Sequence, residues 1–129
     1  MSSAEGDPAV PILLGKARND ALVLRKIAGD GDVADEIVGF HAQQTVEKAL
    51  KAVLEARGLD YPYTHDLARL FILVEDSGGA PGHRDDALAL SPWAAEFRYG
   101  DVVAGSLDRD HAVAVAESIL AWAEGEMAA

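Results

Sequence analysis

The sequence predicts an all-α fold, an up-and-down helical bundle of four main helices plus a short helix. Apolar residues recur at steps of three and four along four long segments, which is the spacing of a helix with one buried face. Of the 129 residues, 24 are alanine and only 6% are aromatic, which favours helix over sheet. No segment alternates between apolar and polar residues for the length of a strand.

The first helix is expected from Val10 to Ala28, after a flexible N-terminus of residues 1–9. Pro11 suits a first helical turn, and the glycines at positions 29 and 31 supply a flexible end. The expected buried line comprises Leu14, Ala17, Ala21, Leu24 and Ala28. Residues 10–127 are treated as a single helical domain, because a chain of this length supports one core and the sequence contains no internal repeat.

The second helix should run from about Val33 to Arg57 and end at Gly58. Either Asp30 or Asp32 is placed to cap its start with a carboxylate. A helix of this length is long enough to organise the whole fold. Its expected apolar line comprises Val33, Ile37, Phe40, Leu50, Val53 and Leu54.

The third helix should begin at Thr64, a good N-cap residue, with Asp66 in its first turn, where a carboxylate meets the positive end of the helix dipole. Its expected buried stripe comprises Leu67, Leu70, Phe71 and Val74. Residues 77–86 are polar and rich in glycine, so we expect a loop there and the most mobile segment of the protein.

A short helix is expected from Ser91, with Pro92 at its first position and an end near Tyr99 and Gly100. Its inner face would hold Trp93, Ala94 and Phe97. The last helix should be capped by Ser106 or Asp108. Its expected seam comprises Leu107, His111, Val115, Ile119 and Trp122. Both tryptophans are therefore expected in the core or at a dimer interface, and His111 at the edge of the core.

Composition excludes several functional classes. Acidic residues outnumber basic residues 22 to 11, and the net charge of −11 disfavours non-specific nucleic-acid binding. There is no cysteine, no histidine spacing typical of a metal site and no phosphate-binding glycine motif, so neither metal nor cofactor is expected. The sequence has no apolar run of about 20 residues and no secretion signal at its start, so we expect no membrane span and a cytoplasmic location.

One polar face of the second helix carries the clearest candidate site. Steps of three and four residues place His41, Gln44, Lys48, Lys51 and Glu55 on that face. Gln43 and Glu47 occupy an adjoining row. One interpretation is a solvated or dimer-facing stripe held by local pairs such as Gln44 with Lys48. The other is a recognition surface for a nucleotide phosphate or a partner protein, in which the lysines supply charge and Gln44 supplies hydrogen bonds.

Three motifs in this order resemble the HEPN family, the "higher eukaryotes and prokaryotes nucleotide-binding" helical domain. The motifs are His41 to Gln44 followed by Glu47 to Ala52, then Thr64 to Leu67, then Ser91 to Asp101. The resemblance spans roughly residues 12 to 125, with one departure at Gly100, where the family commonly has proline. It implies a helical bundle that usually dimerises. It also implies association, in many bacterial relatives, with a small nucleotidyltransferase as a toxin–antitoxin pair.

Some HEPN proteins are metal-independent ribonucleases that use an arginine followed after four to six residues by a histidine. Here Arg98 is followed at those positions by Val103, Ala104 and Gly105, and after Arg57 the next histidine, His65, comes one place too late. The ribonuclease signature is therefore absent, although a histidine from another part of the fold or from a second subunit remains an alternative. His65 more often stabilises a turn than performs chemistry, and His83 lies in the glycine-rich loop with no motif around it.

The sequence thus leads to three hypotheses. The first is a non-catalytic HEPN-type module that binds a nucleotide or a partner, such as a small nucleotidyltransferase, as a homodimer. Its expected binding residues are His41, Gln44, Lys48, Lys51 and Arg98. The second is a ribonuclease toxin with a non-standard pair, such as Arg98 with His41 or His65. The third is a dimeric interaction scaffold that binds no small ligand.

Overall fold

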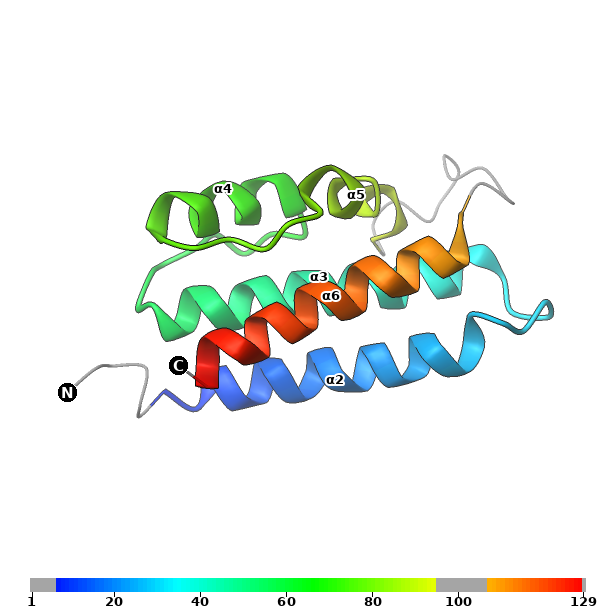
Figure 1. Ribbon diagram of the computed structural model, residues 1–129, viewed down its shortest axis with the longest axis horizontal. Helices are drawn as coiled ribbons and strands as arrows, with labels where there is room; N and C mark the ends of the chain where they lie inside the picture. Colours follow the sequence, from blue (N-terminus) through cyan, green and yellow to red (C-terminus); the bar gives the residue numbers. More distant parts are fainter. Residues whose placement is uncertain (1–6, 95–106, 129) are drawn as a thin grey trace.

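The computed structural model describes residues 7–94 and 107–128 of the chain. This part of the chain is helical and contains no strand, so the predicted all-α fold is confirmed. In chain order its elements are α2 (Ala9–Ile27), α3 (Asp35–Ala56), α4 (Leu67–Ser77), α5 (Arg84–Leu88), the 3₁₀ helix η1 (Ser91–Trp93) and α6 (Arg109–Ala128). Figure 1 shows α4 and α5 on one side of α3 and α2 on the other.

Helix α3 is the central element of the bundle. It packs against α2, α4, η1 and α6, and it runs antiparallel to α2 (Figure 1). Its fully buried apolar residues include Val38, Ala42, Val46, Leu50 and Leu54, which follow one another at four-residue steps. The neighbouring helices add Leu24, Phe71 and Ile119, which are also fully buried. Because α3 is covered on several sides, five of its polar residues are buried as well: Gln43, Gln44, Thr45, Glu47 and Lys51.

The start of α3 differs from the expectation. The helix begins at Asp35, and its N-cap residue, Ala34, makes no side-chain cap. The Asp30 carboxylate accepts a hydrogen bond from Asp32 N within the loop, so neither aspartate caps the helix. Ile37, expected on the buried line, is 46% exposed, and Val38 takes its place because it lies one turn before Ala42 on the packed face.

Arg109, at the start of α6, binds polar groups of the loop before α3, although it lies far from that loop in sequence. Its guanidinium pairs with Asp35 at 2.9 Å. It also donates hydrogen bonds to three backbone carbonyl groups of the α2–α3 connection, those of Ala28, Asp30 and Val33. An arginine of α6 thus binds the carbonyl groups of the connection and the Asp35 carboxylate, while the N-cap residue of α3 offers no side-chain acceptor to the first amides of the helix.

The start of α4 also needs a correction. Its N-cap residue is Asp66, whose carboxylate accepts a hydrogen bond from Ala68 N at 3.0 Å. The Thr64 hydroxyl accepts from Asp66 N, also at 3.0 Å, and so closes the preceding turn instead of capping the helix. In both cases a side-chain oxygen accepts a hydrogen bond from the backbone amide two residues later. Asp66 is the cap because the amide that it binds belongs to the first turn of α4.

The glycine-rich loop after α4 is shorter than predicted, since α5 begins inside it at Arg84. The short helix expected from Ser91 is a 3₁₀ helix that ends before Ala94, whose ψ of 153° is extended. Phe97, Tyr99, Gly100 and Ser106 lie outside the described residues. Asp108 does cap α6, because its carboxylate accepts a hydrogen bond from His111 N at 3.1 Å.

Trp93 is buried, as predicted, and packs on α3 where the helix has a glycine. A Cβ atom built on Gly39 would lie 2.5 Å from the indole ring, closer than any side chain can approach, so the contact requires glycine. Trp122 is only partly buried against the core. His111, expected at the core edge, is exposed, and its Nε2 atom lies 3.1 Å from the Asp86 carboxylate.

Candidate functional site

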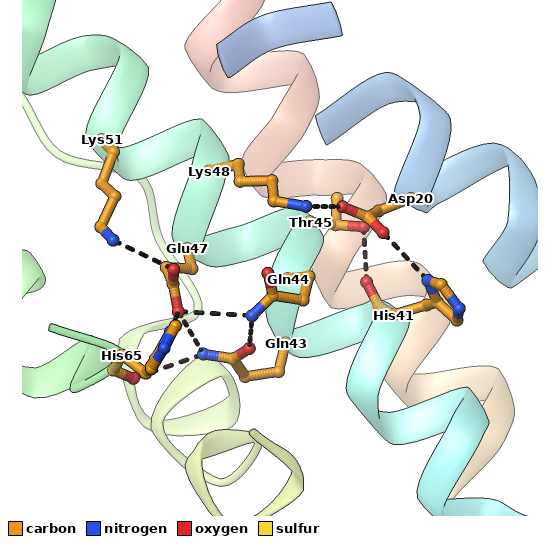
Figure 2. A network of polar contacts seen from close by, with 9 residues as sticks. All are labelled: Asp20, His41, Gln43, Gln44, Thr45, Glu47, Lys48, Lys51 and His65. Carbon is orange, nitrogen blue, oxygen red and sulfur yellow. Dashed lines mark hydrogen bonds and ion pairs between the residues drawn. The ribbon is translucent and has the colours of Figure 1, made fainter. Parts of the chain in front are cut away.

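The polar residues of α3 form two clusters, which Figure 2 shows side by side along the helix. The Asp20 cluster consists of Asp20 on α2 with His41 and Lys48 on α3. The Glu47 cluster consists of Gln43, Gln44, Glu47 and Lys51 on α3 with His65 from the loop before α4. The row predicted from the sequence is thus divided between two carboxylates.

The Asp20 cluster joins α2 to α3. Lys48 Nζ donates to Asp20 Oδ2 at 2.5 Å, and His41 Nδ1 lies 2.9 Å from Asp20 Oδ1. Asp20 itself is only 9% exposed. One carboxylate thus binds two α3 side chains seven residues apart, which lie on the same face of the helix. The histidine ring also meets Phe40 edge-on, with ring centroids 5.4 Å apart.

In the Glu47 cluster, four side chains converge on one carboxylate. Gln43 Nε2 donates to Glu47 Oε1 at 3.0 Å, and His65 Nδ1 lies 2.8 Å from the same oxygen. Lys51 Nζ donates to the other oxygen, Oε2, at 3.1 Å. Gln44 Nε2 makes a longer contact of 3.4 Å with Oε1. The carboxylate of Glu47 is thereby enclosed by donors, and its side chain is only 4% exposed.

The two glutamines also hold each other and the loop. Gln44 Nε2 donates to Gln43 Oε1 at 2.6 Å, while Gln43 Nε2 reaches the backbone oxygen of His65 at 3.3 Å. Both glutamines are buried. In the described part of the chain, no buried side-chain nitrogen or oxygen lacks a hydrogen-bond partner. The cluster is therefore a satisfied polar network inside the bundle.

The electrostatics of Glu47 reflect a balance of opposing effects. Burial acts to raise the pKa of Glu47, because it penalises the charged form. The hydrogen bonds from Gln43 and His65 and the positive charge of Lys51 act in the other direction and outweigh burial. The pKa of Glu47 consequently lies below its ordinary value of 4.5, and the group is a buried carboxylate at neutral pH.

The five residues expected to form a binding site are thus distributed differently from the prediction. His41 and Lys48 lie in the Asp20 cluster, and Gln44 and Lys51 lie in the Glu47 cluster, while Arg98 lies outside the described residues. Gln44 bonds to Gln43 and Glu47 instead of to Lys48. Each lysine of the row is paired with a carboxylate.

Sequence reasoning missed the two residues that organise the clusters. Glu47 was placed in a neighbouring row, although its spacing of four from both Gln43 and Lys51 was a readable signal. Asp20 gave no such signal, since it reaches α3 only through the packing of two helices. His65 does hold a turn, through the contact of its backbone with Gln43, and its ring is also part of the Glu47 cluster.

Arg57, the arginine nearest before His65 in sequence, has a structural role, because it connects neighbouring segments of the bundle. It donates hydrogen bonds to the backbone oxygens of Val74 and Gly79 at the end of α4, and it pairs with Glu126 on α6 at 3.1 Å. Its guanidinium also closely faces Gly78, whose φ of 152° places it in a conformation that suits glycine. Arg57 therefore links α3, the end of α4 and α6.

The described residues contain neither a metal-binding group of side chains nor a membrane-spanning helix. No group of three or more histidine, aspartate or glutamate side chains is arranged there to hold a metal ion. Similarly, no helix of residues 7–94 or 107–128 has the length and apolar character needed to span a membrane.

Comparison with known proteins identifies one family. The sequence model of the HEPN domain matches residues 12–126, which is most of the chain. Neither a curated protein nor a solved structure matches the chain. The resemblance carried by the helix motifs is therefore confirmed at the level of the family.

Proposed function

Since the chain belongs to the HEPN domain family, we propose that it is a non-catalytic member of that family that acts by binding a partner protein. The resemblance supplies a candidate partner, a small nucleotidyltransferase with which the chain would form a toxin–antitoxin-type pair. The chain itself would act as a homodimer. Its proposed binding residues are His41, Gln44, Lys48, Lys51 and Arg98.

The engagement of the cations on α3 is the observation that supports binding over catalysis. Lys48 and His41 share Asp20, while Lys51 and His65 share Glu47. A general acid or base needs a side chain aimed at substrate, and a phosphate clamp needs a positive charge that is not already neutralised. The two clusters instead hold these groups between helices. Recognition then depends on the part of this polar face that reaches the surface, where the side chains of His41 and Lys48 are each 23% exposed. The net charge of −11 favours a basic partner.

Affinity capture of the tagged full chain from its native host, at moderate salt, tests this proposal. We expect a small nucleotidyltransferase in near-stoichiometric amount, identified by mass spectrometry. The same capture with Lys48→Gln tests the polar face, and Lys16→Gln is a matched control because Lys16 is an exposed lysine of α2. Recovery of the chain alone contradicts the paired function.

A nucleotide is the second candidate ligand, and one observation favours it. The Lys48 side chain is 23% exposed, against 11% for Lys51, so its ammonium is the more accessible of the two lysines. A phosphate that binds there would replace the Asp20 carboxylate as the partner of Lys48. Titration calorimetry with ATP, GTP and AMP tests this candidate, with Lys48→Gln expected to abolish the heat. A flat trace for all three nucleotides favours a scaffold or a protein partner.

The choice of variants follows from the burial of Lys51. Glutamate at position 51 would place a second carboxylate beside Glu47 in a buried environment, and the fold would be damaged together with any site. Lys48 is thus the better probe of the polar face.

The ribonuclease alternative is tested separately, by incubating the purified chain with transfer RNA. Cleavage that disappears in Arg98→Ala would contradict the non-catalytic proposal.

A further inference from the structure

A cavity of about 530 Å³ lies beside the C-terminal end of α3, near the start of α2 and the loop after α3. In Figure 1 these three backbone segments lie at the same end of the bundle. Its volume is within the range of sites that bind small molecules. The polar residues in its wall are Asp7, Lys51, Glu55, Asp60, Tyr61 and Tyr63. It is distinct from the Asp20 cluster and touches the Glu47 cluster only through Lys51.

The wall of this cavity carries an excess of negative charge. Three carboxylates face it, those of Asp7, Glu55 and Asp60. The pKa of Glu55 is raised, chiefly because its side chain lies against the Asp7 carboxyl group, which places two acidic groups in contact. The ammonium of Lys51 is already bonded to Glu47. Of the described residues, no lysine or arginine forms an ion pair with these three carboxylates, so an incoming cation would meet negative charge that is not neutralised.

Tyr63 adds an aromatic ring to the wall of the same cavity, and this ring already contacts the ammonium group of Lys51. Its side chain is 96% exposed, so the ring is open to solvent. Lys51 Nζ lies 5.7 Å from the ring centroid, at the distance of a cation–π contact. An alkylammonium group that touches both a carboxylate and the Tyr63 ring is thus already present in the wall of the cavity.

The arrangement of the carboxylates discriminates between kinds of cation. Among the described residues no three acidic or histidine side chains are arranged around one point as a metal ion requires. The acidic groups of the cavity therefore attract positive charge without forming a metal site, and two of them, Asp7 and Glu55, lie in contact. Leu13 and Leu59, also in the wall, offer an apolar surface on which methylene groups can pack.

We propose that this cavity binds a small linear diamine or polyamine, with its ammonium groups on the carboxylates and one of them against the Tyr63 ring. The ligand class follows from three properties of the wall: excess negative charge, an exposed aromatic face and apolar residues. Primary amines of this type are protonated at neutral pH. The cavity shares only Lys51 with the binding residues proposed above, and the variants that test it leave Lys51 unchanged.

Titration calorimetry of the full chain with 1,4-diaminobutane and with spermidine tests the proposal. 1,4-Butanediol, which has the same carbon chain without charge, and magnesium chloride serve as control ligands. We expect saturable binding of the amines and none of the diol. Asp60→Asn and Tyr63→Ala should each weaken amine binding by about tenfold, the loss expected when one charged or cation–π contact is removed.

Asp76→Asn is the matched control, because it removes the same charge from an exposed position on α4, away from the cavity. Its affinity should equal that of the unmodified chain. Three results would overturn the proposal: no saturable heat with either amine, equal weakening by Asp76→Asn, or magnesium that competes as well as the amines do. The last two would show only general attraction to a chain of net charge −11.

Discussion

Asp20 and Glu47 are both carboxylates that bind one lysine and one histidine, but they are placed differently in the bundle. Asp20 belongs to α2 and receives its partners from the facing helix α3, so its ion pairs cross a helix–helix interface. Glu47 belongs to α3 and receives Lys51 and two glutamines from its own helix and His65 from a loop. The side chain of Asp20 is 12% exposed and that of Glu47 is 4% exposed.

This difference indicates in which cluster the loss of one partner should destabilise the fold more. Water near Asp20 can replace a lost partner and screen the remaining charge, whereas the Glu47 cluster is almost closed to water. A buried ion pair adds little over apolar packing, but the removal of one partner is costly because the other is left uncompensated. We therefore expect equal chemical changes to have unequal effects in the two clusters.

Truncation of the two carboxylates should give the largest effect. Glu47→Ala leaves the ammonium of Lys51 without its acceptor and removes one of the two acceptors of each buried glutamine amide, so the free energy of unfolding should fall by about 3–5 kcal/mol. Asp20→Ala should cost about 1–3 kcal/mol, since His41 and Lys48 lie closer to water. Urea denaturation followed by circular dichroism measures both values. Equal losses would show that burial does not separate the clusters.

The pH dependence of stability should come next in size. Because the pKa of Glu47 is lowered in the folded state, its contribution is complete above the ordinary value of 4.5 and is lost as the pH falls through the lowered value. Glu47→Gln lacks this contribution at every pH. The difference in unfolding free energy between the unmodified chain and Glu47→Gln should therefore narrow as the pH is lowered from about 7 to below about 4.

Glu75→Gln serves as the control for that measurement, because Glu75 is an exposed carboxylate on α4. Its difference from the unmodified chain should change little over the same pH interval. A difference for Glu47→Gln that stays constant with pH would contradict the lowered pKa.

The smallest effect is expected for Lys48→Gln. Its side chain is 23% exposed, and Asp20 keeps His41 as a partner after the change, so the free energy of unfolding should fall by less than about 1 kcal/mol. Lys51→Gln should cost more, since Lys51 is half as exposed and its partner is the buried Glu47. Thermal unfolding of the two variants side by side provides the comparison, and the reverse order would refute it.

The sequence was sufficient for properties that depend on local spacing. The helices, the burial of Trp93 and the cap by Asp108 follow from periodicity and short-range hydrogen bonds, and the structure bears them out. It was insufficient where a distant residue decides the outcome. The connection before α3 is bound by Arg109, and the polar row is divided by Asp20; neither contact leaves a pattern in the sequence near α3.

The contacts of Arg109 also bear on the order in which the chain can assemble during synthesis. Helices α2 and α3 are neighbours in sequence and can pair early, but the carbonyl groups of their connection receive the guanidinium of a residue 76 positions after Val33. Until α6 has been made and has docked, those carbonyls must bond to water. The connection is therefore completed only after α6 has left the ribosome, and a nascent chain that stops before α6 presents an unfinished hairpin.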